Sequence, residues 1–446
     1  MKKKKKLSYD RGLTWLTTLF VSILANSFSF WVDHPDHIGW GLAALLAANL
    51  LPLCSLRKFP NFKMRLCNHG SICLRAFRLS AAVSLIYHVS TFRLIPSVSL
   101  EWIFSLLLSV CVLIILYWNG MISVFTTSLQ LGIGGRAGSM LLGRIPLMQL
   151  FAVGKIIKTT TEEVNFEVEK HLVNLARKDQ AICRTQYPIL LVHGVFFRDI
   201  KLVNYWGRIP GELQRNGATV FYGNHQSADS VFGSGEELGL RIREICRKTG
   251  CEKVNIIAHS KGGLDCRAAI ADPEIAKLVA SLTTINTPHR GCQFADYLLS
   301  KIPGETQLKI ASTYNIASKT RGDFDPDFMG AVHNLTARFC CDFDAHTPAP
   351  AGVYCQSVGS RLNSAIDGPF PLNFSSQLIQ HFDGANDGLV GESSFAWGEN
   401  YIFLSSGDGR GISHGDVVDQ NRENISGFDV REFYVQLVAD LKNRGL

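Results

Sequence analysis

The amino-acid sequence predicts an α/β protein, with a mostly parallel sheet covered by helices on both faces, preceded by an α-helical transmembrane region. From about residue 187, strand-like runs such as PILLVHG (188–194) and KVNIIAH (253–259) alternate with helix-like runs such as EELGLRIREICRKTG (236–250). Strands separated by helices are typical of a parallel sheet. The first part of the chain instead carries long apolar stretches. We therefore expect a membrane region at 1–120, an amphipathic connector at 121–186 and an α/β domain at 187–446.

The membrane region contains four stretches that approach the length of a bilayer span, about 20 mostly apolar residues. They cover residues 13–32, 38–56, 76–95 and 100–120. The third stretch contains Arg78, His88 and Arg93, so an interfacial helix is the alternative for it. The first stretch follows a basic N-terminus and has a signal peptide as its alternative, although its apolar part is long for one.

The basic residues predict how these helices are oriented. Lys2–Lys6 precede the first stretch, further lysines and arginines lie between residues 57 and 78, and the loop at 33–37 has none. Cytoplasmic segments are enriched in Lys and Arg. Four crossings then return the chain to the cytoplasm near residue 121. We expect a multi-pass integral membrane protein of the cell membrane whose α/β domain is cytoplasmic. If the third stretch does not cross, that domain lies on the other side.

Composition argues against some classes of function. The net charge is +7, but much of it lies in the N-terminal lysines and in residues 57–78, which fits membrane orientation better than nucleic-acid binding. Without zinc-finger or RNA-binding signatures, we expect no nucleic-acid partner. The 12 scattered cysteines are interpreted as free thiols. Residues 121–158 are apolar but interrupted by Gly, Arg and Pro146, which predicts interfacial helices or else a linker packed on the domain.

One short motif has the pattern of a catalytic nucleophile. Ser260 stands in Ala-His-Ser-Lys-Gly, a Gly-x-Ser-x-Gly motif whose first glycine is replaced by Ala258. Small residues at Ala258 and Gly262 let a strand and a helix approach closely at a tight turn, which strains the serine and lifts its hydroxyl above the sheet. The alternative, a helix N-cap serine, explains neither the small flanking residues nor the strand-like run before them.

A serine nucleophile needs a base and a carboxylate that orients it, here in the chain order Ser, acid, His. His414, in GISHGDVVD, is the candidate base, with His289 in NTPHRG as its main competitor. Asp387, in the turn of GANDGLVG, is the candidate acid, with Asp383 as the alternate. The sequence therefore predicts a catalytic triad of Ser260, Asp387 and His414.

The same chemistry needs an oxyanion hole made of two backbone N–H groups. One belongs to Lys261, the residue after the nucleophile, and the other to the loop after the first strand, where Val195 follows Gly194. His193, in that loop, is interpreted as structural. His259, beside the serine, is expected to point into the turn.

With these residues in place, the domain resembles the bacterial triacylglycerol lipases of the Pseudomonas and Burkholderia type. The resemblance runs over about 187–296 and resumes over about 352–420, and includes PILLVHG, NYWGRIPGELQRNGATVF, LVASLTTINTPHRGCQFAD, NDGLV and SHGDVVDQ. It implies an α/β-hydrolase fold, hydrolysis of carboxylic esters, and the same triad and oxyanion donors. The chain departs from the family in Ala258 and in its membrane region, since the family is usually secreted.

That family carries a structural calcium ion near the catalytic histidine. The resemblance maps two of its ligands onto Asp416 and Gln420. The earlier aspartate ligand would fall near DGPFPLNFSS, where Asn373 is the best position and Asp367 lies nearby. Because a lost carboxylate weakens a site for a hard cation, the implied calcium site is weakened here. We expect no required cofactor.

Residues 297–350 match the family least, and family members place a mobile lid there. Apolar side chains of this segment could face lipid or pack on the domain: Ile302, Leu308, Ile310, Phe324, Phe328 and Met329. The prediction is a membrane-anchored serine carboxylester hydrolase, a lipase or esterase, that cleaves acyl esters of glycerolipids through an acyl-enzyme on Ser260. The alternatives are a lipid acyltransferase with the same triad and an inactive hydrolase-like membrane binding module. Acyl chain length and head group stay open.

Overall fold

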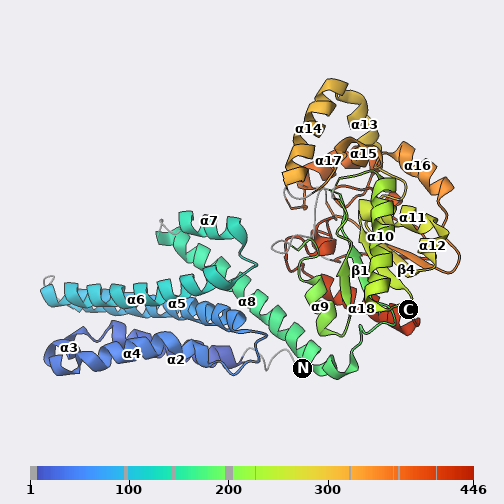
Figure 1. Cartoon of the computed structure of the whole chain (residues 1–446). Coiled ribbons are helices and arrows are strands. Elements are labelled where there is room, and N and C mark those ends of the chain that lie inside the picture. Colours follow the sequence, from blue (N-terminus) through green and yellow to red (C-terminus); the bar gives the residue numbers. More distant parts are fainter. Residues whose placement is uncertain are drawn as a thin grey trace. The chain divides into compact units, whose positions relative to one another are not determined.

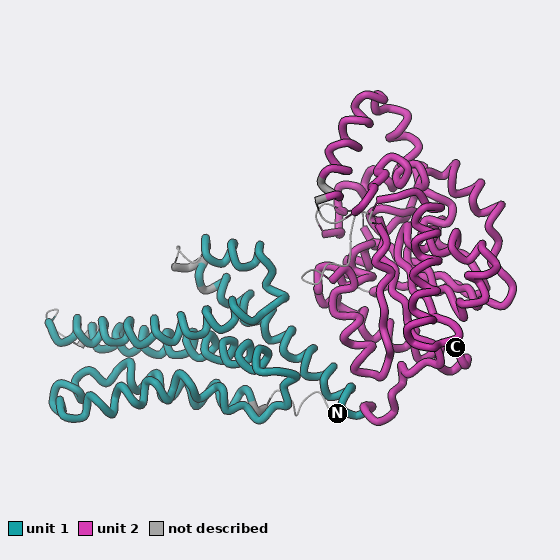
Figure 2. Tube along the Cα trace, in the orientation of Figure 1, with its two compact units in different colours: residues 1–176 teal, residues 177–446 magenta. Residues whose placement is uncertain are grey.

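The computed structural model describes residues 8–94, 99–142, 146–195, 204–226, 228–320, 323–364, 366–369, 372–407 and 409–446. The chain forms two compact units, residues 1–176 and 177–446 (Figure 2). The predicted connector is divided between them, because 121–176 belong to the first unit and 177–186 to the second. The basic segment Lys2–Lys6 lies outside the described residues.

The described part of the first unit is helical (Figure 1). Its helices are α2 (Ser8–Ala25), α3 (Phe28–Asp33), α4 (Ile38–Leu50), α5 (Phe62–Leu94), α6 (Leu100–Thr127), α7 (Gly132–Leu142) and α8 (Pro146–Arg177), which ends at the unit boundary. Three described segments are long and apolar enough to cross a membrane: Pro35–Cys54, Phe62–Phe92 and Leu100–Thr127. These segments suggest that the protein associates with a membrane.

The first predicted span, 13–32, is not one helix. α2 ends at Ala25 and α3 begins at Phe28. The helix ends here because the Asn26 side-chain amide donates to the Ser22 carbonyl oxygen at 2.7 Å, in place of a backbone N–H group. The other three predicted stretches overlap the three candidate segments, and the third forms the second half of the long helix α5. How many helices cross, and in which direction, stays a prediction.

Side-chain hydrogen bonds show that α2 and α5 run parallel to each other. The Asn68 amide donates to the Asp10 carboxylate at 3.2 Å, and the Asn26 amide donates to the Ser84 hydroxyl at 3.0 Å. In both helices, the residue that forms the second hydrogen bond lies farther toward the C-terminus than the residue that forms the first. The start of α2 therefore lies level with the first turns of α5, the part of that helix that is rich in basic residues.

Asn119 of α6 connects α6 with α4 and α5 at the same end of the unit. Its side-chain amide donates to the carbonyl oxygen of Asn49 in α4 at 3.1 Å, and its side-chain oxygen lies 3.3 Å from Nε2 of His69 in α5. The start of α2, the end of α4, the start of α5 and the last part of α6 therefore lie at one end of the helices.

The second unit is built on a six-stranded sheet in the order β2-β1-β3-β4-β5-β6, in which every pairing is parallel. The strands are β1 (Ile189–Val192), β2 (Val220–Tyr222), β3 (Val254–His259), β4 (Val279–Ile285), β5 (Tyr354–Ser360) and β6 (Asn400–Leu404). Each connection between neighbouring strands in this order contains helix, as parallel pairing requires. The predicted parallel α/β fold is confirmed.

Helices cover both faces of this sheet. α9 (Ile209–Arg215) and α18 (Val430–Asn443) pack on the face that includes Ile257, whereas α10 (Val231–Thr249) and α11 (Lys261–Ala271) pack on the face that includes Ile256. Adjacent residues of a strand point to opposite faces, so the continuous apolar run of β3 serves both cores.

The remaining helices lie between α11 and β4 or follow the carboxyl ends of β4 and β5. They are α12 (Pro273–Ala276), α13 (Gln293–Lys301), α14 (Gly304–Thr320), α15 (Phe328–His333), α16 (Ala337–His346) and α17 (Leu372–Asp383). α13 and α14 stand at one end of this unit, at the top of Figure 1. All 12 cysteines have free thiols.

Candidate active site

Ser260 occupies a strained turn between a buried strand and a helix. β3 ends at His259 and α11 begins at Lys261, and Ser260 between them has φ 56° and ψ −134°. A positive φ is costly for a residue with a side chain and persists only where the surroundings enforce it. The Ser260 side chain makes no capping hydrogen bond to α11. The geometry is therefore that of a nucleophile turn rather than of an N-cap serine.

Two glycines allow the chain to close around this turn. A Cβ atom at Gly262 would collide with the carbonyl oxygen of His193, and one at Gly194 would lie 2.8 Å from Cβ of Ser260. The loop after β1 therefore lies directly against the serine. Ala258 is fully buried, and the chain accommodates its methyl group where the motif usually has glycine.

Asp387 and His414 form a hydrogen-bonded pair although they come from different loops. His414 Nδ1 lies 2.6 Å from Asp387 Oδ2, and the His414 backbone N–H donates to the Asp387 carbonyl oxygen at 2.8 Å. Asp387 is completely buried and His414 nearly so. The carboxylate therefore holds a proton on Nδ1, which leaves Nε2 to act as a base.

The Asp387 carboxylate is held by further donors. Oδ1 accepts the backbone N–H groups of Leu389 and Val390, both at 2.9 Å, and Oδ2 also accepts the side-chain amide of Asn286 at 2.6 Å. Asn286 follows β4 with φ 46° and donates to Ser360 Oγ at 2.7 Å as well. These contacts fix the acid in one orientation. No local sequence pattern marks Asn286.

His259 links the serine turn to the base. Its ring centroid lies 4.5 Å from that of His414, and its Nδ1 lies 2.6 Å from the Tyr205 hydroxyl oxygen. Burial, and secondarily the neighbouring His414, lowers the pKa of His259 well below its ordinary value. His259 is therefore neutral at neutral pH and adds no second positive charge when His414 takes up a proton.

Two residues, Lys261 and Val195, are the predicted oxyanion donors. Lys261 is the first residue of α11, where backbone N–H groups have no partner within the helix. Val195 follows Gly194 in the loop that contacts the serine. The Lys261 side chain turns away into a buried ion pair, with Nζ 2.6 Å from Asp265 Oδ1, so only its backbone is available at the turn.

A second buried cluster is built around Asp265, the ion-pair partner of Lys261. His225 Nε2 lies 3.7 Å from Asp265 Oδ2, and the His225 ring stacks on that of His193 with centroids 4.0 Å apart. Burial lowers the pKa of His193 to about 3 and raises the pKa of Asp265 to about 6. His193 has the structural setting that the sequence indicated. No sequence motif pointed to His225 or Asp265.

The two alternative candidates, His289 and Asp383, contact other residues. His289 is fully buried, with Nε2 2.9 Å from the Thr284 hydroxyl and Nδ1 3.0 Å from the Arg267 guanidinium. Asp383 accepts the N–H groups at the start of α13, including that of Gln293 at 3.0 Å. Neither alternate takes part in the Asp387–His414 pair.

Asp416, one of the residues that the resemblance maps to calcium, has a poor fit to that ion. Asp416 Oδ1 accepts the Arg410 guanidinium at 3.0 Å, and Oδ2 accepts the backbone N–H of Ser413 at 3.0 Å and its hydroxyl at 2.7 Å. A cationic side chain thus stands where a cation would need the carboxylate. Across the described ranges, no group of three or more His, Cys, Asp or Glu side chains is placed to hold a metal ion. Calcium at Asp416 and Gln420 stays an untested prediction, to which Asp416 fits poorly.

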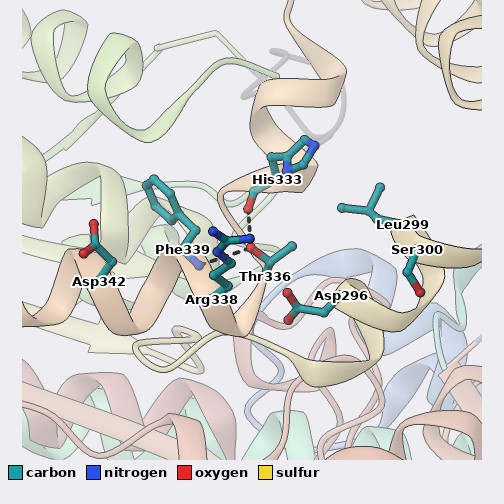
Figure 3. A pocket seen from close by; sticks show the side chains of 8 residues that line it. All are labelled: Asp296, Leu299, Ser300, His333, Thr336, Arg338, Phe339 and Asp342. Carbon is teal, nitrogen blue, oxygen red and sulfur yellow. Dashed lines mark hydrogen bonds between the residues drawn. The ribbon is translucent and has the colours of Figure 1, made fainter. Parts of the chain in front are cut away.

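A separate pocket of about 830 Å³ lies between α13 and the α15–α16 segment (Figure 3). Its lining residues are Asp296, Leu299, Ser300, His333, Thr336, Arg338, Phe339 and Asp342. None of the predicted triad residues lines it. This pocket belongs to the helices that cover the sheet end and not to the nucleophile turn.

The parallel sheet, the strained serine turn and the buried Asp–His pair together define an α/β hydrolase. No family model matches the chain. The chain is 32% identical over 296 residues to a triacylglycerol lipase of Pseudomonas fragi, an alignment that covers 59% of this chain and 98% of that one. It therefore belongs to the triacylglycerol lipase family, a family of carboxylic ester hydrolases.

Two further comparisons cover less or are more distant. The chain is 36% identical over 179 residues to a triacylglycerol lipase of Burkholderia plantarii, covering 37% of this chain and 49% of that protein. It thus spans about half the length of this relative, and of one from Pseudarthrobacter phenanthrenivorans. The solved structure of the mature lipase BlEst2 of Bacillus licheniformis is similar with a TM-score of 0.42 and 22% identity, over 56% of this chain and 91% of that one.

Proposed function

We propose that the second unit is a serine carboxylic ester hydrolase that cleaves acyl esters through an acyl-enzyme on Ser260. One arrangement carries the proposal: the buried Asp387–His414 pair packs its imidazole against His259, the neighbour of a serine held at φ 56°. Family membership supports the same class of reaction, because the relatives named above are triacylglycerol lipases.

In the first half of the proposed reaction, His414 Nε2 takes the proton of the Ser260 hydroxyl while Oγ attacks the ester carbonyl carbon. The carbonyl oxygen becomes an oxyanion, which the backbone N–H groups of Val195 and Lys261 stabilise. Asp387 keeps the imidazole in the required tautomer and stabilises its positive charge. His414 then donates the proton to the leaving alcohol oxygen as the tetrahedral intermediate collapses to an acyl-serine.

The second half repeats these steps with water. His414 removes a proton from the water molecule, whose oxygen attacks the acyl carbonyl carbon. The new intermediate expels Ser260 Oγ, which regains its proton from His414, and a carboxylic acid leaves. The residues of this chain therefore supply every proton transfer, and no step passes through a metal ion.

For the first unit, we propose that it anchors the enzyme in the cell membrane through four crossings, α2, α4, α5 and α6. Support comes from the three apolar segments and from the hydrogen bonds that gather the start of α2, the end of α4 and the start of α5 at one end. That end carries the basic residues of 57–78, so it faces the cytoplasm by the positive-inside rule. The substrates proposed on this basis are glycerolipids.

The segment predicted as a lid is proposed to contact lipid through its exposed apolar side chains. Leu308 and Ile310 on α14, and Phe324 beyond it, are exposed, whereas Ile302 and Phe328 are partly buried. Exposed apolar residues that gather in one region are typical of interaction surfaces. Some apolar residues of 297–350 are therefore available to face lipid, whereas others pack on the domain.

The activity is tested with full-length wild type and Ser260→Ala in detergent, assayed on triacylglycerol, phospholipid and short p-nitrophenyl esters. Wild-type hydrolysis of at least one ester class, lost in Ser260→Ala, supports the proposal. Hydrolysis that the substitution leaves unchanged would refute the mechanism. For topology, phosphatase and fluorescent-protein fusions after residues 36 and 160 should show phosphatase activity only at the first position.

A further inference from the structure

The first unit contains a pocket of about 670 Å³ bounded by α2, α5 and α8. Its wall combines apolar side chains, among them Trp15 and Leu79, with the cationic side chains of Arg11, Arg75 and Lys158. It lies entirely within residues 10–165 and shares no residue with the proposed active site. A wall of this kind fits a ligand that is anionic at one end and apolar at the other.

Arg75 is the central cation of this pocket. Its Nη2 donates to the Thr161 hydroxyl at 2.6 Å and to the Ser71 hydroxyl at 3.1 Å, and the residue is partly buried. Neutral hydroxyl groups do not balance its charge. In the described part of the first unit, no carboxylate forms an ion pair with it, and Asp10, whose charge acts on it from farther away, is paired with Arg57. A guanidinium held between helices without a counter-ion favours the binding of an anion.

The carboxylate of Asp10, which also lines the pocket, is already engaged. Arg57 pairs with it at 2.7 Å, with both side chains largely buried, and Ser55 and Asn68 donate to its other oxygen at 3.3 and 3.2 Å. The Asp10–Arg57 pair is therefore neutral as a unit. It leaves Arg75 to interact with whatever occupies the pocket.

The other charged lining residues are exposed and leave the pocket with a net positive charge. Arg11 and Lys158 have no ion-pair partner among the described residues, and Glu162 is the one further acidic residue of the lining. With Asp10 neutralised by a residue outside the lining, three cations face one carboxylate. Long-range attraction and direct contact therefore both favour an anion.

The pocket lies where the surface of the first unit changes from charged to apolar. Trp15 is 63% exposed and Leu79 is 37% exposed, and both continue into exposed apolar side chains farther along α2 and α5, such as Leu19 and Val83. In the opposite direction lies the basic start of α5, which includes Lys63 and Arg65. Tryptophan at such a boundary is typical of the membrane interface, where lipid headgroups lie.

We infer that this pocket binds the headgroup of an anionic phospholipid. The phosphate is held by Arg75, with Lys158 and Arg11 beside it, and the acyl chains lie along Trp15 and Leu79. A guanidinium suits this role because its N–H groups can donate to two phosphate oxygens at once. The inference does not depend on the proposed hydrolysis, since no residue of the proposed active site takes part.

The test is binding of phosphatidylglycerol to delipidated full-length protein in a neutral detergent, followed by native mass spectrometry and by titration with a fluorescent phosphatidylglycerol. Arg75→Gln is expected to weaken binding at least about tenfold, because it removes a charge-assisted hydrogen bond. Lys158→Gln is expected to weaken it about fivefold. The matched control is Lys63→Gln, which removes the same charge from an exposed site on α5 outside the pocket and should change affinity less than twofold.

Three results would overturn the inference. In the first, Arg75→Gln binds phosphatidylglycerol as wild type does. In the second, Lys63→Gln weakens binding as much as Arg75→Gln, which would mean diffuse attraction to the whole basic end. In the third, millimolar inorganic phosphate displaces the lipid completely, which would mean that the acyl chains contribute nothing. If circular dichroism shows that Arg75→Gln is misfolded, the exposed Lys158→Gln decides, and unchanged affinity there also overturns the inference.

Discussion

The buried ion pair beside the nucleophile turn allows a sharp prediction about stability. Lys261 Nζ and Asp265 Oδ1 are 2.6 Å apart, and both side chains are 2% exposed. On the surface of the same unit, Lys277 and Glu274 form a pair of 2.5 Å with side chains 68% and 67% exposed. The two pairs have nearly the same length and differ mainly in burial. Comparing them isolates the effect of burial on a charged contact.

Asp265→Asn leaves the Lys261 ammonium group buried without its carboxylate, and breaking such a pair costs about 3–5 kcal/mol. Glu274→Gln removes a solvated pair worth about 0–1 kcal/mol. Because burial raises the pKa of Asp265 to about 6, the comparison belongs at pH 8, where this group is ionised. At about 2–4 °C per kcal/mol for a domain of this size, Asp265→Asn lowers the melting temperature by about 6–20 °C and Glu274→Gln by less than about 4 °C.

The assay is thermal unfolding of the full-length protein in detergent, followed by circular dichroism. Replacing both partners, Lys261→Met with Asp265→Leu, should recover more than half of the loss, because neither charge is then buried. Where Asp265→Asn still folds, its kcat should fall while KM stays near the wild-type value, since the Lys261 backbone N–H is the proposed oxyanion donor. If Asp265→Asn is as stable as Glu274→Gln, or the double variant is no better than the single one, the reasoning is wrong.

Further predictions concern Asp387, the Asn286 side chain that holds it, the Arg410–Asp416 ion pair and stability at low pH. Asn286→Ala removes one donor to Asp387 and should lower kcat about 10- to 100-fold with KM unchanged, measured on a p-nitrophenyl ester; unchanged kcat argues against its positioning role. Asp387→Asn should lower kcat about 10⁴-fold, and full activity would exclude it as the acid. Arg410→Gln should lower the melting temperature by a few degrees while EDTA leaves the wild type unchanged; a loss with EDTA that calcium restores contradicts the fit described above. Burial lowers the pKa of His193 from 6.5 to about 3, so the unfolded chain binds more protons than the folded chain between these pH values. The free energy of unfolding therefore decreases as the pH is lowered across that interval, by up to about 1.4 kcal/mol per pH unit. His193→Asn should flatten this slope in denaturant titrations, and an unchanged slope would exclude His193 as its cause.

The sequence predicted those parts of the fold and site that depend on local patterns. Strand-like and helix-like runs alternate along the domain, and the structure forms the parallel sheet they predict. The turn at Ser260 could be predicted because small residues are needed on both sides of a strained serine. Asp387 and His414 stand in short turns late in the chain, and the order Ser, acid, His selected them from several candidates. The structure brings the two side chains together, and their catalytic roles stay a prediction.

Contacts between distant segments could not be predicted in the same way. Asn286 meets Asp387 across 101 positions, and Tyr205 meets His259 across 54, so no local pattern marks either pair. The poor fit of Asp416 to calcium could not be predicted either. Arg410 stands close to Asp416 in sequence, but an arginine in a loop carries no sign of which carboxylate it will bind. Only the folded chain shows that Asp416 is already paired.

The helix break at Asn26 shows a limit of hydropathy. A window of about 20 residues averages over a single asparagine, and it therefore predicts one continuous span at 13–32. The backbone responds to the single residue, because the Asn26 amide competes for the carbonyl oxygen of Ser22. Composition can detect an apolar segment, but the positions where helices end depend on individual side chains.

Direct labelling of the nucleophile tests the central claim that Ser260 carries the acyl group. Full-length wild type is treated with a fluorophosphonate probe, digested, and analysed by mass spectrometry, with Ser260→Ala as the control. We predict one modification on the peptide that contains Ser260 in the wild type and none in the variant. An unlabelled wild type, or label on a different residue that persists in Ser260→Ala, would contradict the account.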